Sequence, residues 1–219
     1  MRDLIKQEQF ELEALDRLNS GKFLKSLIFC GGTMLRLCYG LNRFSVDLDF
    51  WVAERINEKE LFSGLKTYLS RFYTITDSMN KYSTLLFELK SKDYPRRLKL
   101  EIRKEKKAVK TAQTIAYSKY SNIQVLIRAA DLEDMMSAKI EAFLERKEIR
   151  DIFDLEFLCK KGVSINASPE NLKKLISGIG RLNKKDYTVK LGSLLEAGER
   201  QYYSKENFKI LKAAINYPL

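Results

Sequence analysis

The segments C-G-G-T-M-L-R-L (residues 30–37) and R-F-S-V-D-L-D-F (residues 43–50) decide the fold of this chain. The apolar run Leu27 to Cys30 predicts a short buried strand that enters a turn at the glycine pair. A helix is expected after the turn, with Thr33 as its cap and Gly40 at its end. The first segment therefore predicts a strand, a glycine turn and a helix in immediate succession.

The second segment predicts another strand, Ser45 to Val52, that carries two acidic residues. Side chains alternate between the faces of a strand, so Asp47 and Asp49 share one face while Leu48 and Phe50 point into the core. Two neighbouring carboxylates repel each other, and a hard divalent cation removes that cost. Magnesium is commonly held by one or two carboxylates together with substrate phosphates. The pair therefore indicates a site for Mg²⁺ or Mn²⁺.

The glycine pair Gly31-Gly32 lies where a strand meets a helix, upstream of the two acids. Glycine lets the backbone approach a phosphate closely, and a helix N-terminus favours anions. Thr33 and Ser45 add hydroxyl donors. A nucleoside triphosphate (NTP) held there would present its α-phosphorus to metal ions on the acids for in-line displacement of pyrophosphate. Taken alone, the glycine pair could be a simple turn and the two aspartates could face solvent. Their order along the chain favours a catalytic site.

The remaining pattern predicts a small mixed sheet followed by helices. Ile5 to Leu18 is amphipathic and Asn57 to Phe72 is a second helical stretch. Three further strands are expected, at 73–77, 84–89 and 98–103, and a polar loop or connection at 104–121. Helices are expected at 131–146, 149–160, from Ser168-Pro169 onward, and at 204–215. The expected division is an α/β lobe, 1–120, and a mainly helical lobe, 121–219.

Composition excludes several classes of protein. The 219 residues include no histidine, which excludes Ser-His-Asp and Cys-His catalysis and the common zinc hydrolases. Three cysteines without a C-x-x-C pair argue against a disulfide framework or a zinc site. The 45% of hydrophobic residues are enough for a core. Because there is no membrane-spanning run or leader pattern, a cytoplasmic location without a membrane partner is expected.

A surplus of basic residues predicts a polyanionic partner. Lysine and arginine number 40 against 29 acids, a formal charge of +11. Between Lys90 and Arg128 twelve basic residues outnumber three acids, with Tyr94, Tyr117 and Tyr120 among them. Cations release the counterions of a phosphate backbone, and tyrosines stack on unpaired bases. RNA is the partner this favours, and a merely solvated basic loop is the alternative.

The two segments resemble the first motif of the AbiEii/MenT family of nucleotidyltransferase toxins, G-G-T-x-L-R followed by R-x-S-x-D-L-D-F. Downstream, K-I-E-A (residues 139–142) and R-D-I-F-D-L (residues 150–155) are similar to the family motifs K-x-x-A and R-D-x-x-D-L. The resemblance spans residues 27–158, and Val46 departs from a frequently acidic position. It implies an α/β (α+β) fold with a polymerase-β-like nucleotidyltransferase core, plus a C-terminal helical lobe that completes the nucleotide site and binds RNA. It also implies a toxin with a cognate protein antitoxin.

The resemblance assigns roles to the matching residues. Gly31, Gly32, Thr33, Arg36, Arg43 and Ser45 would bind nucleotide phosphates. Lys139 and Asp151 would complete the nucleotide site, with Asp154 beside them to contact ribose or assist the acceptor hydroxyl. Glu101 would be the third carboxylate, a metal ligand beside Asp47 and Asp49, and the general base. A solvent-facing sheet surface explains Glu101 equally well, and surface ion pairs are the alternative for Lys139, Asp151 and Asp154.

The expected activity is therefore metal-dependent transfer of a nucleotide from an NTP to an RNA 3′ end, with the tRNA acceptor stem as the favoured target. Two alternatives stay open. One is an enzyme of the same fold that nucleotidylates or phosphorylates protein. The other is a catalytically inactive RNA-binding module, which has no need of like charges at Asp47 and Asp49.

Overall fold

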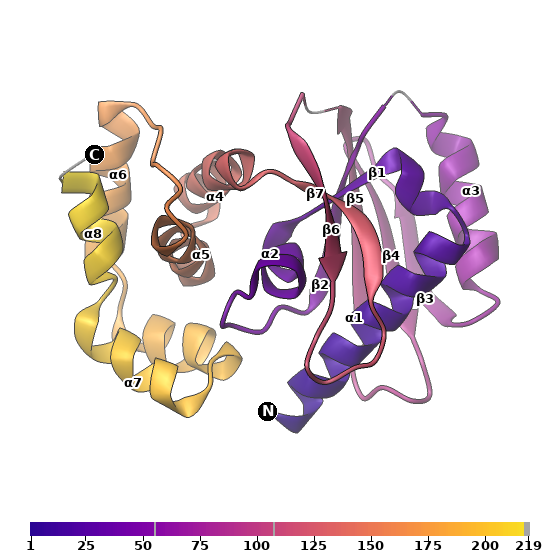
Figure 1. Ribbon diagram of the computed structural model, residues 1–219, viewed down its shortest axis with the longest axis horizontal. Coiled ribbons are helices and arrows are strands. Elements are labelled where there is room, and N and C mark those ends of the chain that lie inside the picture. The colour runs from indigo at the N-terminus through magenta and orange to yellow at the C-terminus, as the bar shows by residue number, and fades with distance from the viewer. Residues whose placement is uncertain (55, 107, 217–219) are drawn as a thin grey trace. The chain divides into compact units, whose positions relative to one another are not determined.

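The computed structural model describes residues 1–54, 56–106 and 108–216, and the chain forms two compact units, Met1–Ala130 and Asp131–Leu219 (Figure 1). The first unit is built on one sheet and the second is helical. Among the described residues, no helix has the length and apolar character needed to cross a membrane.

The first unit contains a seven-stranded mixed sheet in the order β3-β4-β5-β2-β1-β7-β6. Parallel pairs are β1 with β7 and β2 with β5, and the other neighbours are antiparallel. The strands are β1 (Leu27–Cys30), β2 (Asp47–Val52), β3 (Thr74–Asn80), β4 (Thr84–Lys90), β5 (Leu98–Lys106), β6 (Thr111–Ala116) and β7 (Val125–Ala130). β2 thus lies near the middle of the sheet, between β5 and β1.

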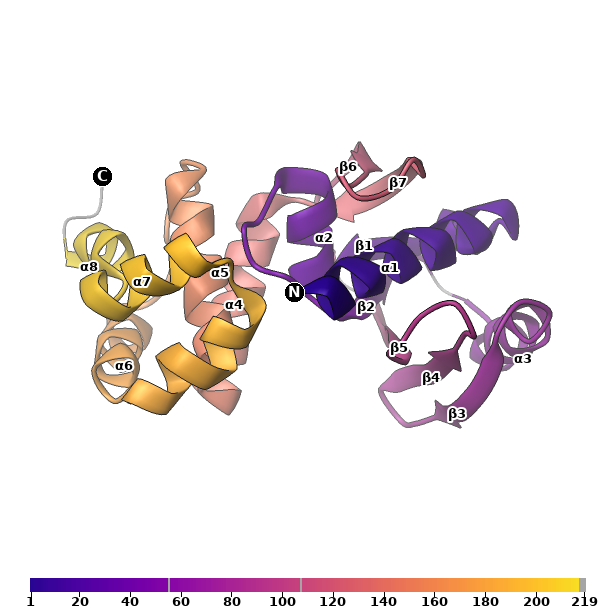
Figure 2. The same cartoon turned by 90° about the horizontal axis from the view of Figure 1, so that it is seen from below.

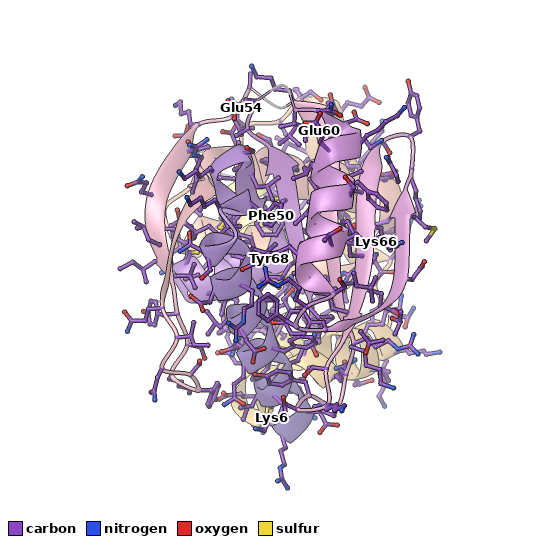
Figure 3. All side chains as sticks on the ribbon, turned by 90° about the vertical axis from the view of Figure 1, so that its right-hand side faces the viewer. Lys6, Phe50, Glu54, Glu60, Lys66 and Tyr68 are labelled. Atoms are coloured by element: carbon purple, nitrogen blue, oxygen red, sulfur yellow. The ribbon has the colours of Figure 1, made fainter. Side chains whose placement is uncertain are left out.

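Four helical segments belong to this unit: α1 (Arg2–Ser20), η1 (Phe23–Ser26), α2 (Gly31–Tyr39) and α3 (Glu58–Leu69). Figure 3 looks onto α1 and α3 in front of the sheet, with Phe50 of β2 seen between them. The ring of Phe62 on α3 stacks on Phe87 of β4 at 5.0 Å between ring centres. Phe50 is 1% exposed, so the apolar side chains of β2 belong to this core.

The second unit contains α4 (Leu132–Arg146), α5 (Ile149–Lys160), α6 (Pro169–Gly180), η2 (Asp186–Leu191), η3 (Gly192–Leu194), α7 (Ala197–Glu206) and α8 (Lys209–Asn216). Asp131 caps α4 and Ser168 caps α6 through their side chains. The proline after Ser168 occupies the first turn, where no backbone N–H is needed. α5 contacts both α4 and α8 (Figure 2).

Many elements match the expectations from sequence. The strand Leu27–Cys30 and the helix Ile149–Lys160 have the expected bounds, and Gly40 ends α2 in the left-handed conformation with φ +79°. The expected mixed α/β arrangement with C-terminal helices is confirmed.

Three expectations were wrong. The segment 104–121 is not a loop, because β5 continues to Lys106 and β6 occupies Thr111–Ala116. Thr33 is not the cap of α2, because Gly31 adopts φ +79° and the helix starts there. The single helix at 204–215 is two helices, separated at Asn207 and Phe208, which both have positive φ.

The division into units falls after Ala130 because β7 pairs with both β1 and β6 and so belongs to the sheet. Lys107, one of the twelve basic residues between Lys90 and Arg128, lies outside the described residues.

Candidate active site

The two aspartates of β2 share one face of the strand. Asp47 and Asp49 are partly exposed, whereas Leu48 and Phe50 between and beyond them are buried. The strand rise of about 3.3 Å per residue separates their α-carbons by roughly 7 Å. Strand alternation therefore places both carboxylates on the face opposite to Phe50, as expected.

The neighbouring strand β5 adds Glu101 and Lys99 to this face. In the parallel register Asp49 is level with Glu101 and Asp47 with Lys99. The Lys99 amino group forms an ion pair with Glu101. Burial disfavours the charge of Lys99, but Glu101, Asp47 and Asp49 outweigh it and raise the Lys99 pKa. Lys99 is thus paired with one carboxylate and attracted electrostatically by two more.

Lys99 is a site residue that sequence reasoning missed. The alternation in β5 did place Lys99 and Glu101 on the same side, away from Leu98 and Leu100. The sequence does not show that β5 pairs with β2. This pairing joins residues 52 positions apart, such as Asp49 and Glu101.

The glycine pair lies against the acidic and basic side chains of this site. A methyl group on Gly31 would collide with the carboxylate of Asp49. A methyl group on Gly32 would lie 2.5 Å from Nη2 of Arg43 and 2.9 Å from Oγ of Ser45. An alanine at either position would have to displace these side chains, and at Gly31 it would also have to adopt a φ of +79°.

Arg43 and Ser45 consequently lie at the start of α2. Arg43 is 2% exposed and donates from Nη1 to the backbone oxygen of Phe44 at 3.0 Å. The first turn of a helix has backbone N–H groups without intrahelical partners and about half a positive charge. A guanidinium, a hydroxyl and this helix end together form a place suited to phosphate.

Thr33 and Arg36 are engaged with the protein itself. The Thr33 hydroxyl donates to the backbone oxygen of Asp47 at 2.6 Å, which ties α2 to the start of β2. Arg36 pairs with Glu8, donates to the Leu41 oxygen at 3.1 Å and lies 3.9 Å from the centre of the Phe44 ring. In this structure both side chains position the strand and loop around the site.

Helix α1 supports the same site through buried polar residues that the sequence analysis did not single out. The Gln7 amide donates to the backbone oxygens of Val46 at 3.1 Å and Arg97 at 3.3 Å, just before β2 and β5. Glu11 is fully buried, and its carboxyl oxygens have no hydrogen-bond partner among the described residues. Burial raises the Glu11 pKa well above its usual value, Glu8 and Asp47 add to the rise, and Arg36 opposes it.

A second cluster, within the helical unit, gathers the downstream residues. Lys139 of α4 lies 3.3 Å from Oδ1 of Asp151 and 2.6 Å from Oδ2 of Asp154, both on α5. Arg146 binds Asp151 through two hydrogen bonds of 2.7 and 2.5 Å. Both aspartates are 0% exposed and Lys139 is 7% exposed. These are buried ion pairs, not the surface pairs that were the alternative.

The tyrosines of the basic stretch differ in what they contact. Tyr94 is partly buried, stacks on Phe10 at 4.6 Å between ring centres and donates to Glu13 at 2.7 Å, so its ring is engaged within the protein. Tyr120 stacks on Phe44, and the Lys119 amino group lies 5.1 Å from the centre of the Tyr120 ring. Tyr117 is 58% exposed and is the member of the three best placed to meet a ligand.

The donor chemistry of β2 fits a hard divalent cation, because two carboxylates share a face beside a phosphate-suited helix end. Within residues 1–54, 56–106 and 108–216, no group of three or more His, Cys, Asp or Glu is arranged to hold a metal. Glu101 is engaged with Lys99. Asp47 and Asp49 are the carboxylates of this face that could act as ligands together with substrate phosphates.

Two solved structures from Helicobacter pylori have a fold similar to that of this chain. JHP933 of Helicobacter pylori matches with a TM-score of 0.57 and 23% identity over 95% of this chain and 93% of that one. A nucleotidyltransferase-like protein of H. pylori matches with a TM-score of 0.57 and 22% identity over 95% and 96%. The two matches establish a shared fold.

The family model for the nucleotidyl transferase AbiEii toxin of type IV toxin–antitoxin systems matches residues 13–213. The chain belongs to this family, and it is a nucleotidyltransferase. No curated protein sequence matches it.

Proposed function

We propose that this protein transfers a nucleotide from an NTP to the 3′ end of an RNA, with tRNA as the acceptor, in a reaction that needs Mg²⁺ or Mn²⁺. The observation that carries the proposal is the placement of Asp49 against Gly31 and of Arg43 and Ser45 against Gly32. Carboxylates for a cation thus adjoin groups suited to a polyphosphate, as nucleotidyl transfer requires.

In this proposal Asp47 and Asp49 hold the cation, which when bound neutralises phosphate charge and polarises the reacting phosphate. Arg43, Ser45 and the backbone of Gly31 and Gly32 bind the phosphates. Thr33 and Arg36 act by positioning, because their side chains are already engaged with Asp47 and Glu8.

Glu101 is the proposed third carboxylate, which accepts the proton of the acceptor hydroxyl. Its support is the register that sets it level with Asp49. The chain has no histidine for this task. Lys99, paired with Glu101, would hold that carboxylate in position beside Asp49.

Lys139, Asp151 and Asp154 are proposed to serve nucleotide binding from the helical unit. Their support is the family motif they match and the cost of burying them, because a lysine held nearly inaccessible between two carboxylates is an expensive arrangement. A Lys139→Arg variant, which keeps a positive charge between the two buried carboxylates, tests this role: the NTP KM should rise while the protein remains folded.

RNA as acceptor is supported by the formal charge of +11. A protein acceptor has no need of such a surplus, whereas a phosphate backbone does. The toxic effect would follow from acceptor ends blocked by added nucleotides, with a cognate antitoxin as partner. NTP and tRNA as substrates imply action in the cytoplasm.

The test is incubation of purified protein and total tRNA with each α-labelled NTP and Mg²⁺ or Mn²⁺. Label should enter RNA with at least one nucleotide, stop with a chelator, and fall by about 100-fold or more in Asp49→Ala. Asp77→Ala is the matched control, since Asp77 is an exposed strand aspartate of β3 away from the site.

Two results would contradict the proposal. Label recovered in polypeptide and absent from RNA would establish a protein acceptor. No transfer to RNA with any of the four nucleotides and either metal would remove the RNA assignment.

A further inference from the structure

The helical unit has a groove whose charge the reaction chemistry does not use. It has a cavity volume of about 560 Å³ and lies along α6 and the chain that follows it to η2. We name it the basic groove, after its five basic side chains: Lys147, Lys173, Lys174, Arg181 and Lys190. Two acids, Glu170 and Asp186, also line it, so cations exceed acids by three.

The acids neutralise only two of the cations. Glu170 pairs with Lys174 at 2.6 Å and Asp186 with Lys190 at 3.0 Å. Lys173 and Arg181 are exposed and have no carboxylate partner among the described residues. An excess of positive charge therefore remains at the groove itself.

Packing fixes the position of a further cation, Lys147. Gly178 of α6 lies so close to the Phe143 ring of α4 that an added methyl group would come within 2.6 Å of it. The Lys147 amino group lies 5.5 Å from the centre of the same ring and donates to the Leu144 oxygen at 2.5 Å. The close approach of α4 and α6 thus brings Lys147 to the groove.

The donors along α6 form a row. Lys173 and Ser177 are four residues apart and lie on one face of α6, and Arg181, four residues further on, is the residue directly after the helix end. At about 1.5 Å per residue, the row is roughly 12 Å long. A row of this length suits several successive phosphates better than one isolated anion.

The composition of the groove favours nucleic acid over protein. Leu182 is the one large apolar side chain among the described residues that line it. Protein interfaces depend on several buried aromatic or aliphatic anchors, and a single leucine does not supply them. Phosphate contacts need only cations and hydrogen-bond donors, and Ser177 and Asn183 supply donors beside the lysines.

We propose that the basic groove binds the phosphate backbone of the acceptor RNA. This inference rests on the proposed function, because it takes RNA as the acceptor. The groove holds the RNA by charge and without reading its bases, and Lys173 and Arg181 contribute most, since their charges are not neutralised by carboxylates.

The test compares Lys173→Ala/Arg181→Ala with Lys59→Ala/Lys66→Ala. The control removes the same charge from exposed residues of α3, where Lys66 is labelled in Figure 3. Binding of fluorescent tRNA is measured by anisotropy from 50 to 200 mM salt. The groove variant should bind at least about tenfold more weakly, with a log–log salt slope smaller by about 2, while the control stays close to wild type.

The NTP KM and thermal unfolding are measured on the same proteins, and neither should change, because both residues are exposed. Lys173→Glu/Arg181→Glu should weaken RNA binding further. The groove proposal is overturned if the groove variant keeps wild-type tRNA affinity and slope. It is also overturned if the variant changes only the NTP KM, or only the binding of purified antitoxin.

The two proposals fail in different ways. If wild-type protein neither labels nor binds RNA, the proposed function falls and the groove proposal with it. If wild-type protein labels tRNA and the groove variant binds tRNA as wild type does, the groove proposal alone falls.

Discussion

Replacing Gly31 with alanine separates backbone strain from displacement of the catalytic carboxylate. Gly31 and Gly40 both have φ +79°, a conformation that costs an alanine about 1–2 kcal/mol. The added methyl group meets nothing within 4 Å at Gly40, whereas at Gly31 it collides with the Asp49 carboxylate. Gly40→Ala is therefore a control with the same strain and no collision.

The size of the effect follows from the geometry. Ordinary contact for such a methyl group begins near 3.4 Å, so the Asp49 carboxylate must retreat by about 1 Å. A misplacement of that size can lower turnover by roughly 100-fold. Both variants should lose about 1–2 kcal/mol of unfolding free energy in urea, but only Gly31→Ala should lose transfer activity.

The assay is incorporation of labelled nucleotide into tRNA at saturating NTP, with urea unfolding of each variant beside it. Equal activity in Gly31→Ala and Gly40→Ala would refute the reasoning, because it would mean that the Gly31–Asp49 contact does not position the carboxylate.

Other perturbations follow from the same structure. Glu11→Gln should raise the urea midpoint of unfolding at neutral pH. The raised pKa of Glu11 means that the wild-type protein loses stability as pH rises above 4.5, because a buried carboxylate must then be ionised. The difference in midpoint between variant and wild type should vanish below that pH. A gain that persists below that pH would contradict this. Asp151→Ala should cost about 3–5 kcal/mol in urea unfolding, because it leaves Lys139 with one partner fewer and Arg146 without its bidentate carboxylate. Glu170→Ala removes an exposed ion pair and should leave the urea midpoint unchanged. Equal losses of stability in the two variants would refute the claim that the buried pair matters more than the exposed one. Thiol reagents should label native protein slowly at pH 8, because burial raises the pKa of Cys38 to about 12 and of Cys159 to about 11; rapid labelling without urea would be the contrary result.

The elements that sequence predicted are those whose signal is local. The apolar run of β1 and the alternation of β2 follow from the residues themselves, as does the cap-and-proline start of α6. β6 was not predicted because it is an edge strand with mostly exposed residues and therefore shows no apolar alternation. The break between α7 and α8 at Asn207 was not predicted. Asparagine adopts the left-handed conformation readily, but no neighbouring residue indicates that Asn207 does so.

The site was predictable where one strand or one turn contains it. Asp47 and Asp49 share a face by alternation alone. Lys99 required knowledge that β5 lies beside β2, and Gln7 and Glu11 look like the solvent side of an amphipathic helix although the structure buries them. The closeness of Lys139 to Asp151 and Asp154 depends on how α4 packs against α5, which helical spacing does not determine.

The hydrogen bonds of Gln7 have a consequence for biosynthesis. Its amide joins the chain before β2 to the chain before β5, and its bond to Arg97 spans ninety positions. A ribosome adding about 5–20 residues per second needs roughly 5–18 s to make that stretch. During that interval a nascent chain cannot pair β2 with β5. The candidate site therefore forms only after most of the first unit has been translated.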